Sequence, residues 1–284
     1  MVYVIECSIY QKENFVLKAD FHIHSTISDG SDSIHTIIAQ ALEKQIFAIA
    51  ITDHDTLAHR KHIPLHPGLI VLTGVEISAH DKESKKNAHI LGYNIQNPTS
   101  LENWMLPTLL KRHQNSLKQI EVLQKNKFSI HEHLLNKADG KYIYKQHILE
   151  YLLKTGQIQQ MYESFYDSVF KNHGLCDFDI EYPDIYEAVE MILFAGGIPV
   201  LAHPGQQQNF ELIPKLVPHG LKGLEYNHYS NEKLDKTILK SYSEEHHLFL
   251  TGGSDYHGKN QRERTHIGDY LSESSGINSL IQIK

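Results

Sequence analysis

The stretch from residue 19 to residue 51 restricts the fold more than any other part of the chain. In residues 19–24, apolar and polar side chains alternate with the period of two that is expected of a β-strand. Apolar residues at three- and four-residue steps then predict an amphipathic helix over residues 34–46. Residues 48–51 are apolar on both faces. A strand buried on both sides after a β-loop-α unit indicates a parallel sheet covered by helices.

Further short strands and helices are predicted along the chain. The strands cover residues 69–72, 75–77, 89–93, 198–202, 223–226 and 248–251, and the helices cover residues 185–194 and 234–246. The alternation of strands with helices favours a barrel-like α/β architecture over a β-sandwich. In such a barrel, catalytic residues gather at the carboxyl ends of the strands.

Residues 101–182 follow a different pattern. Leucine and isoleucine recur there at helical spacing, with no strand pattern between them. Polar and proline-containing turns flank the segment. We therefore predict an inserted helical subdomain over residues 101–182, within a barrel domain made of residues 1–100 and 183–284. The place of residues 1–18 stays open, because the apolar residues 2–5 could form an extra strand or pack on the barrel.

The net charge, the cysteines and the apolar stretches limit the kinds of partner and of cellular location that we expect. The formal net charge of −7 argues against an extended nucleic-acid-binding surface, which needs clustered Lys and Arg, but it is compatible with a small anionic substrate. Cys7 and Cys176 form no C-x-x-C pair and are predicted to be free thiols. Glycine and proline interrupt the longest apolar stretch, residues 191–202, so no membrane segment is expected and the protein is predicted to be cytoplasmic.

The chain contains 21 histidines, which is more than an ordinary composition provides. One group lies in polar or helix-surface contexts and is interpreted as surface residues without a role in a site: His35, His59, His62, His66, His80, His131, His133, His246 and His247. Other histidines follow predicted strands and need another explanation.

Candidate metal ligands lie at or just after the predicted strand ends. They are His22, His24, Asp29, His54, Glu76, His89, His203, Asp255 and His257. Buried charge is costly unless it is paired or coordinates a metal, so this convergence predicts a metal site. Nitrogen and oxygen ligands without cysteine suit zinc, manganese, iron or magnesium in a catalytic site. At about four ligands per ion, the set predicts two or three divalent cations, with Glu76 as the bridging candidate.

Short motifs containing these residues occur in a fixed order. They are DFHIHS at 20–25, SDG at 28–30, TDHDT at 52–56, GVEIS at 74–78, HILG at 89–92, AHPG at 202–205 and GSDYH at 253–257. In this pattern the chain resembles the polymerase and histidinol phosphatase (PHP) family of metal-dependent phosphoesterases, over residues 19–95 and 186–270. The insertion is similar in position and length to the branch of nucleoside 3′,5′-bisphosphate phosphatases and 5′-to-3′ exoribonucleases.

The resemblance implies a distorted, TIM-like (β/α)7 barrel with a trinuclear metal site. It implies three ligand groups: His22, His24, Glu76 and Asp255 for the first metal; Glu76, His89 and His203 for the second; Asp29, His54 and His257 for the third. Mn²⁺ is the expected metal, with Zn²⁺, Fe²⁺ or Mg²⁺ as alternatives.

The implied activity is hydrolysis of phosphomonoesters by metal-activated hydroxide. The expected substrates are small nucleotides, such as a 3′,5′-bisphosphonucleotide, or the 5′ ends of short RNA. A histidinol-phosphate-type phosphatase is the alternative within the same class. An amidohydrolase ranks behind, because the strand ends carry Glu76 and no bridging lysine, and a non-catalytic metal-binding module ranks behind because no ligand is lost.

Several other residues have predicted roles in the site. Asp53, and similarly Asp20, is interpreted as an acceptor that orients a ligand histidine, and His228 is a candidate acid for the leaving group, with a surface histidine as the alternative. Arg112, Lys145 and His147 are candidates for a phosphate grip, with a solvated helix face as the alternative. Gln206, Asn115 and Lys145 stand where relatives often have Arg, which removes planar, bidentate phosphate donors.

Overall fold

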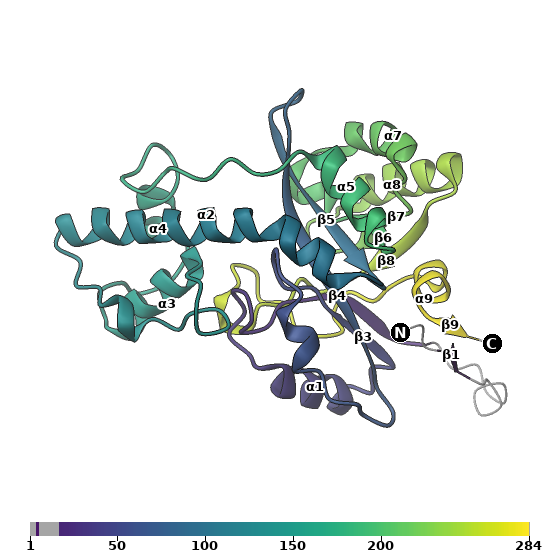
Figure 1. The fold of residues 1–284 in the computed structure, drawn as a ribbon, viewed down its shortest axis with the longest axis horizontal. Helices are drawn as coiled ribbons and strands as arrows, with labels where there is room; N and C mark the ends of the chain where they lie inside the picture. Colours follow the sequence, from purple (N-terminus) through teal and green to yellow (C-terminus); the bar gives the residue numbers. More distant parts are fainter. Residues whose placement is uncertain (1–3, 6–16, 284) are drawn as a thin grey trace.

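A curved, seven-stranded sheet forms the centre of the computed structural model, which describes residues 4–5 and 17–283 (Figure 1). Spatial order and sequence order agree in this sheet. Its strands are β2 (Ala19–Ile23), β3 (Ala48–Ile51), β4 (Ile70–Asp81), β5 (Lys86–Tyr93), β6 (Ile198–Leu201), β7 (Gly223–Asn227) and β8 (Phe249–Gly252). The predicted α/β barrel architecture is therefore confirmed, as a nearly closed barrel of seven strands.

The direction of the strands differs in part from the prediction. β2, β3 and β4 are parallel, and so are β6, β7 and β8, but β5 runs antiparallel to both of its neighbours. A short hairpin joins β4 to β5 and leaves no room for the crossover that a parallel pair needs. The separate strands predicted at 69–72 and 75–77 are one strand, because Thr73 still pairs with β3 and Gly74 pairs with β5.

The barrel closes where the segment after β8 meets β2. The backbone N–H of His24 donates to the carbonyl of Tyr256 at 2.8 Å, and Ile23 and Tyr256 form a parallel bridge. Asp20 accepts hydrogen bonds from the backbone and hydroxyl of Ser254, at 3.0 and 2.6 Å. A Cβ atom at position 253 would collide with Cβ of His22, so this approach requires glycine. The first strand and the last loop are thereby joined.

Some helices cover the outside of the barrel, and others project from it (Figure 1). The α-helices are α1 (Ile34–Glu43), α2 (Pro98–Lys125), α3 (Lys145–Lys154), α4 (Ser164–Val169), α5 (Ile185–Phe194), α6 (Pro204–Gln207), α7 (Ile213–Leu216), α8 (Lys233–His246) and α9 (Ser274–Leu280). Short 3-10 helices occupy Ala58–Lys61, Glu132–Leu134, Phe210–Leu212, Val217–His219 and Gly258–Asn260. Among the described residues, none of the helices is both long and apolar enough to cross a membrane.

The packing of α1 and α5 follows their sequence patterns. Ser33 caps α1 by accepting from the N–H of Thr36, and the apolar face of α1 packs against Ile23 and Ile51. This helix ends at Glu43, earlier than predicted, because Gln45 adopts a positive φ of 55°. The buried face of α5 packs on β4 and β5 in a second hydrophobic cluster.

Residues 98–182, which we call the helical segment, project to the left of the barrel in Figure 1. Side chains of α2, α3 and the following loop form a hydrophobic cluster of their own, which includes Leu123, Leu149, Phe170 and Cys176. The division of the chain into a barrel and an inserted subdomain stays a prediction, because Leu101 and Met105 of α2 pack in a cluster with residues of the barrel. Cys176 is a free, buried thiol as predicted, whereas Cys7 lies outside the described residues.

The ends of the chain meet in a small sheet. β1 (Val4–Ile5) pairs in parallel with β9 (Gln282–Ile283), and this two-stranded sheet is separate from the barrel sheet. Of the two possibilities left open for residues 2–5, the described residues 4–5 thus form a strand.

Candidate metal centre

All of the predicted ligands come together at one end of the barrel. His22 lies in β2 and His24 directly follows it, while Glu76 and His89 lie in β4 and β5. The others lie in loops that follow strands: Asp29, His54, His203, Asp255 and His257. His22, His24, Asp29, Glu76 and His203 are almost completely buried. The alternation of side chains along a strand therefore directs polar groups into the barrel mouth and apolar groups into the surrounding layer.

Glu76 lies at the centre of the cluster. Its Oε2 atom is 3.1 Å from Nε2 of His22, 3.0 Å from Nε2 of His24 and 3.2 Å from Nδ1 of His54. Its Oε1 atom is 2.6 Å from Nδ1 of His89 and 2.8 Å from Nε2 of His203. One carboxylate thus contacts histidines that the resemblance distributes over different metals, which is the geometry expected of a bridging ligand.

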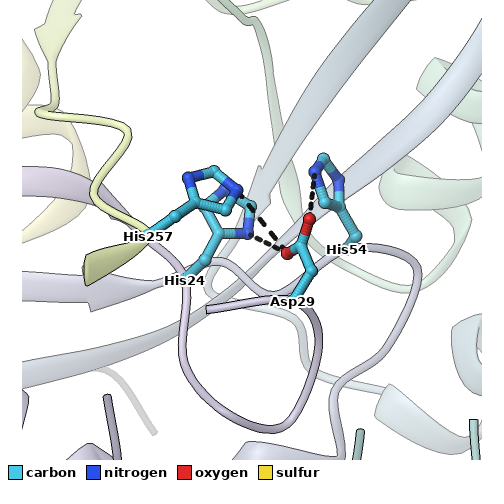
Figure 2. A group of neighbouring side chains, drawn as sticks. All are labelled: His24, Asp29, His54 and His257. Atoms are coloured by element: carbon cyan, nitrogen blue, oxygen red, sulfur yellow. Dashed lines mark ion pairs between the residues drawn. The ribbon is translucent and has the colours of Figure 1, made fainter. Parts of the chain in front are cut away.

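A second group of side chains surrounds Asp29. Figure 2 shows His24, His54 and His257 directed toward the carboxylate of this residue. Nε2 of His257 is 3.5 Å from Oδ1 of Asp29, and the nearest nitrogen atoms of His24 and His54 lie 3.8 and 3.9 Å from the carboxylate. These separations are longer than ordinary hydrogen bonds, so the four side chains face a common point without being bonded to one another.

The donor atoms fit divalent metal ions. Atoms that share one first-row cation lie about 3.0–3.5 Å apart, because metal–nitrogen and metal–oxygen distances are about 2.0–2.2 Å. Groups of possible ligand atoms with mutual distances within 4.8 Å occur at His24, Asp29, His54 and His257, at His22, His24, Glu76 and Asp255, and at His54, Glu76 and His89. Within the described residues, Nδ1 of His24, Nδ1 of His54, Oε2 of Glu76 and Oδ1 of Asp255 are buried without a hydrogen-bond partner. Metal ions would satisfy these atoms.

The protonation states of His54 and His24 are relevant to metal binding. Burial lowers the pKa of His54 to about 4, although Glu76 and Asp29 oppose the shift, so His54 is neutral and can ligate a metal at pH 7. Burial disfavours the charged form of His24, but Asp255 and Glu76 outweigh it and raise the pKa to about 10. A metal must therefore displace a proton from His24, and metal binding becomes weaker as the pH falls.

Two buried residues in or near this cluster were not predicted. Glu225 of β7 is fully buried; its Oε1 atom lies 2.9 Å from Nδ1 of His22, and its Oε2 atom accepts from the backbone N–H of His203 at 2.8 Å. A carboxylate inside a strand that reads as buried could have indicated it. His59 was interpreted as a surface residue, and this is wrong: it is fully buried, with Nδ1 2.9 Å from Asp53.

The acidic residues next to the ligands hold loops rather than ligand histidines. Asp53 accepts from the backbone and hydroxyl of Ser25 at 2.7 and 2.8 Å, and from the hydroxyl of Ser28 at 2.6 Å. It pairs with His59 and not with a predicted ligand. Asp20 fixes the loop after β8, as described above, and accepts from the N–H of Gly268 at 2.7 Å. Both residues therefore stabilise the path of the chain around the cluster.

The structure places His228 behind Asp255. Its Nε2 atom is 3.4 Å from Oδ2 of Asp255, and its Nδ1 atom is 2.7 Å from the hydroxyl of Ser230. The surface alternative is wrong, because His228 is only 1% exposed. It is also absent from the lining of the cavity next to the cluster. A role as the acid stays a prediction that this position does not favour.

The residues predicted to grip phosphate occupy different positions. Arg112 and Lys145 line the cavity above the cluster, together with Asn115 and Gln206. Arg112 forms an ion pair of 2.7 Å with Asp55 and donates to the hydroxyl of Ser78 at 2.9 Å. His147 is buried, and its Nδ1 atom accepts from the N–H of Tyr144 at 3.0 Å. The interpretation of His147 as a solvated helix residue is thus excluded, and its local role is to cap α3.

Comparisons with known proteins agree with this site. No family model matches the chain. The chain is 37% identical over 255 residues to a phosphoribosyl 1,2-cyclic phosphate 1,2-diphosphodiesterase of Eggerthella lenta, covering 88% of this chain and 97% of the relative. It is 28% identical to the 5′-3′ exoribonuclease Rnm of Escherichia coli, with 86% of each protein covered. It is 25% identical to a 3′,5′-nucleoside bisphosphate phosphatase of Chromobacterium violaceum, covering 88% of this chain and 91% of the relative.

A solved structure gives the same result. A protein of Bifidobacterium adolescentis described as a metal-dependent phosphoesterase superposes with a TM-score of 0.81 and 26% identity, over 94% of this chain and 96% of the other. The similarity thus extends through the barrel and the helical segment. The chain belongs to the PHP family of metal-dependent phosphoesterases and is a hydrolase of phosphoester bonds.

Proposed function

We propose that the protein hydrolyses a phosphoester bond on the ribose of a small substrate that carries a second phosphate group. The observation that carries this proposal is a cavity of about 360 Å³ directly above the cluster. Its volume lies near the lower end of small-molecule sites, which span about 300–1,000 Å³. One nucleotide or sugar phosphate matches this size better than a long polymer does.

Two kinds of side chain among those that line the cavity are relevant to phosphate binding. The first kind is the predicted metal ligands Asp29, His54, Glu76, His89, His203, Asp255 and His257. Cationic side chains stand among the other lining residues: Arg112, Lys145, Lys171 and Arg262. A substrate with one phosphate at the metals and a second phosphate at these cations would use both kinds of side chain.

The ammonium group of Lys145 is the strongest indication that the cavity binds a second anionic group. Its ammonium group lies 5.9 Å and 5.6 Å from the ring centroids of Tyr166 and Phe170, and no carboxylate within the described residues forms an ion pair with it. Burial lowers its pKa, and repulsion by Lys171 and Arg112 adds to this effect against the attraction of Asp179. A phosphate bound here would relieve that repulsion, so we propose Lys145 and Arg112 as substrate-binding residues.

The names of the relatives support a ribose phosphate as the substrate. One is named for a phosphoribosyl cyclic phosphate, one for RNA and one for a nucleoside bisphosphate. Ribose and phosphate are common to these three substrates, whereas the bond that is cleaved differs. We therefore propose a substrate that contains ribose and phosphate. The assay below decides whether the bond that is cleaved belongs to a cyclic diester or to a monoester.

We propose that two or three divalent cations, Mn²⁺ first, occupy the three ligand groups implied by the resemblance. Such cations would activate a water molecule as the nucleophile and neutralise charge on the phosphoryl oxygens. The chain itself positions the substrate through Arg112 and Lys145 and keeps His54 neutral for ligation. Glu76 bridges the ligand groups through its contacts with five histidines.

A substrate panel tests the proposal. It would contain phosphoribosyl 1,2-cyclic phosphate, a 3′,5′-bisphosphonucleotide, a short 5′-phosphorylated RNA and histidinol phosphate. Ribose 1,2-cyclic phosphate and a nucleoside 3′-monophosphate, which keep the bond to be cleaved and lack the second phosphate, are the matched controls. Ring opening and release of phosphate are both followed by phosphorus NMR, with Mn²⁺ and with chelator, for the wild type and His54→Ala.

We expect turnover of a ribose substrate with two phosphates to be at least about 10-fold faster than turnover of its one-phosphate control, and we expect it to be lost with chelator or in His54→Ala. Equal rates for the substrate and its one-phosphate control would contradict the second anion site. Turnover of histidinol phosphate alone would replace the ribose assignment by the alternative within the same class.

A further inference from the structure

The ligands of the group in Figure 2 are held differently from the rest of the cluster. His22, Glu76 and His89 lie inside strands, where the sheet fixes the backbone. Asp29 and His54 lie in loops after β2 and β3. The residue after His54, Asp55, has a positive φ of 56°, which is a costly conformation for a residue other than glycine. A backbone bridge to Glu76 holds His54 at the edge of the sheet, and contacts from outside the sheet add to this support.

The helical segment supplies contacts to these loops. We propose that it is a structural part of the metal position formed by His24, Asp29, His54 and His257, and that the hydroxyl groups of Tyr144 and Tyr162 hold the ligands of this position. Tyr144 and Tyr162 are positioning residues in this proposal, since neither touches the metal ligand atoms. The proposal concerns the metal centre and does not depend on the substrate proposed above.

The first contact holds the loop that carries His54. Tyr144 caps α3 and is 1% exposed, and its hydroxyl donates to the carbonyl of His54 at 2.8 Å. Arg112 of α2 binds the carboxylate of Asp55 at 2.7 Å, and its guanidinium lies 5.2 Å from the centroid of the Tyr144 ring. Two helices of the segment therefore grip consecutive residues of one loop.

The second contact holds Asp29 and His257 through Asn260. The hydroxyl of Tyr162 donates to the carbonyl of Asn260 at 2.5 Å. The side-chain amide of Asn260 donates to the carbonyl of Asp29 at 2.9 Å, and its backbone N–H donates to the carbonyl of His257 at 3.3 Å. Asn260 is 2% exposed, so water does not substitute easily for these bonds. The segment thereby reaches two more ligands of the same metal position.

Both contacts end on the backbone next to ligands of one group. In this arrangement, loosening the helical segment displaces Asp29, His54 and His257 together and leaves the ligands within strands in place. The affinity of this one metal position then depends on the segment. Loss of groups that orient metal ligands typically weakens metal binding by about 10- to 100-fold.

The test uses Tyr144→Phe, Tyr162→Phe and the double variant, which remove the hydroxyl groups and keep the rings. Tyr142→Phe is the matched control, because Tyr142 packs beside Tyr144 in the same cluster, and among the described residues its hydroxyl has no hydrogen bond to the barrel. His257→Ala identifies the metal equivalent that belongs to this position. Metal content after dialysis and calorimetric titration of chelator-treated protein with Mn²⁺ are measured without substrate.

We expect the double variant to bind the equivalent identified by His257→Ala at least about 10-fold more weakly, with the other equivalents unchanged and each single variant in between. Circular dichroism and thermal unfolding of the metal-free proteins check the fold. Wild-type affinity for every equivalent in the double variant would overturn the proposal. So would an equal loss in Tyr142→Phe, or a uniform weakening of all equivalents, because either indicates a general loss of stability.

Discussion

The carboxylate of Glu76 lies 3.2 Å from Nδ1 of His54, and the same two residues also pair through their backbones as an isolated parallel bridge. The backbone bridge and the side-chain contact thus both hold Glu76 and His54 next to each other. The bridge extends the sheet beyond the end of β3, because Asp55 N–H donates to the carbonyl of Glu76 at 2.9 Å. The centre of the metal cluster is therefore built on the sheet.

Glu76→Gln is expected to remove at least one metal equivalent and to lower kcat by at least about 100-fold. An amide carries one acceptor atom in place of two, so it cannot contact His22, His24, His54, His89 and His203 as the carboxylate does. Metal analysis and the phosphate assay check this. Glu83→Gln, on the surface, is the control. Full metal content with near-normal kcat would exclude a bridging role.

Glu225→Gln is expected to weaken metal binding by about 10- to 100-fold while the protein stays folded. In the wild type, one oxygen faces Nδ1 of His22 and the other accepts from the N–H of His203. The amide nitrogen must face one of these groups and cannot accept a hydrogen from it, which disturbs the tautomer of His22 or the loop of His203. Titration with Mn²⁺ measures the loss, with the exposed Glu244→Gln as control. An unchanged dissociation constant would show that Glu225 does not orient these ligands.

His147 is expected to make the metal-free protein less stable in acid. Burial lowers its pKa from 6.5 to about 4. The unfolded chain therefore binds a proton more readily than the folded protein does, and stability falls as the pH drops from about 6.5 to 4, by about 3 kcal/mol. Urea unfolding at pH 7.5 and pH 5 should give a smaller pH-dependent difference for His147→Gln than for the wild type. The exposed His35→Gln should behave as the wild type, and equal slopes for all three would refute the assignment.

Arg112→Lys is expected to lower kcat/KM by about 10-fold, mainly through a higher KM. One terminal nitrogen of the Arg112 guanidinium donates to both Asp55 and Ser78, which leaves the other terminal nitrogen for a ligand in the cavity, whereas a lysine ammonium has a single nitrogen. Steady-state kinetics on the best substrate of the panel measure the change. Arg60→Lys is the matched control, because Arg60 pairs with Glu102 at 3.0 Å and does not line the cavity. Equal kinetics for both variants would place Arg112 outside the binding site.

The sequence predicted the strand positions and the ligand cluster because both follow from local patterns. Alternation in residues 19–24 placed His22 and His24 on one face, and the buried run 48–51 placed His54 at a strand end. The family motifs added the grouping of the ligands. The roles of these residues as ligands stay predictions, although the structure brings them together.

Other features depend on distant contacts and left no local signal. The burial of His59 follows from its pairing with Asp53, and the hydrogen bond of Tyr162 with Asn260 joins residues far apart in the chain. His203 and Asp255 have positive φ angles of 25° and 48°, which only the surrounding fold imposes. The antiparallel direction of β5 was also missed. An apolar strand pattern specifies neither the neighbouring strand nor the direction in which the two strands pair.

The closure of the barrel has a consequence for assembly. His22 and His24 come from the first strand of the barrel, whereas Asp255 and His257 come from the loop that bridges back to it. A chain that has not yet reached Asp255 during synthesis therefore lacks one of the four residues of the first ligand group. Cations that bind only the joined ends stabilise the closed ring by mass action. The metal ions would thus link the first strand of the barrel to its last loop, and they would bind fully only once the barrel has closed.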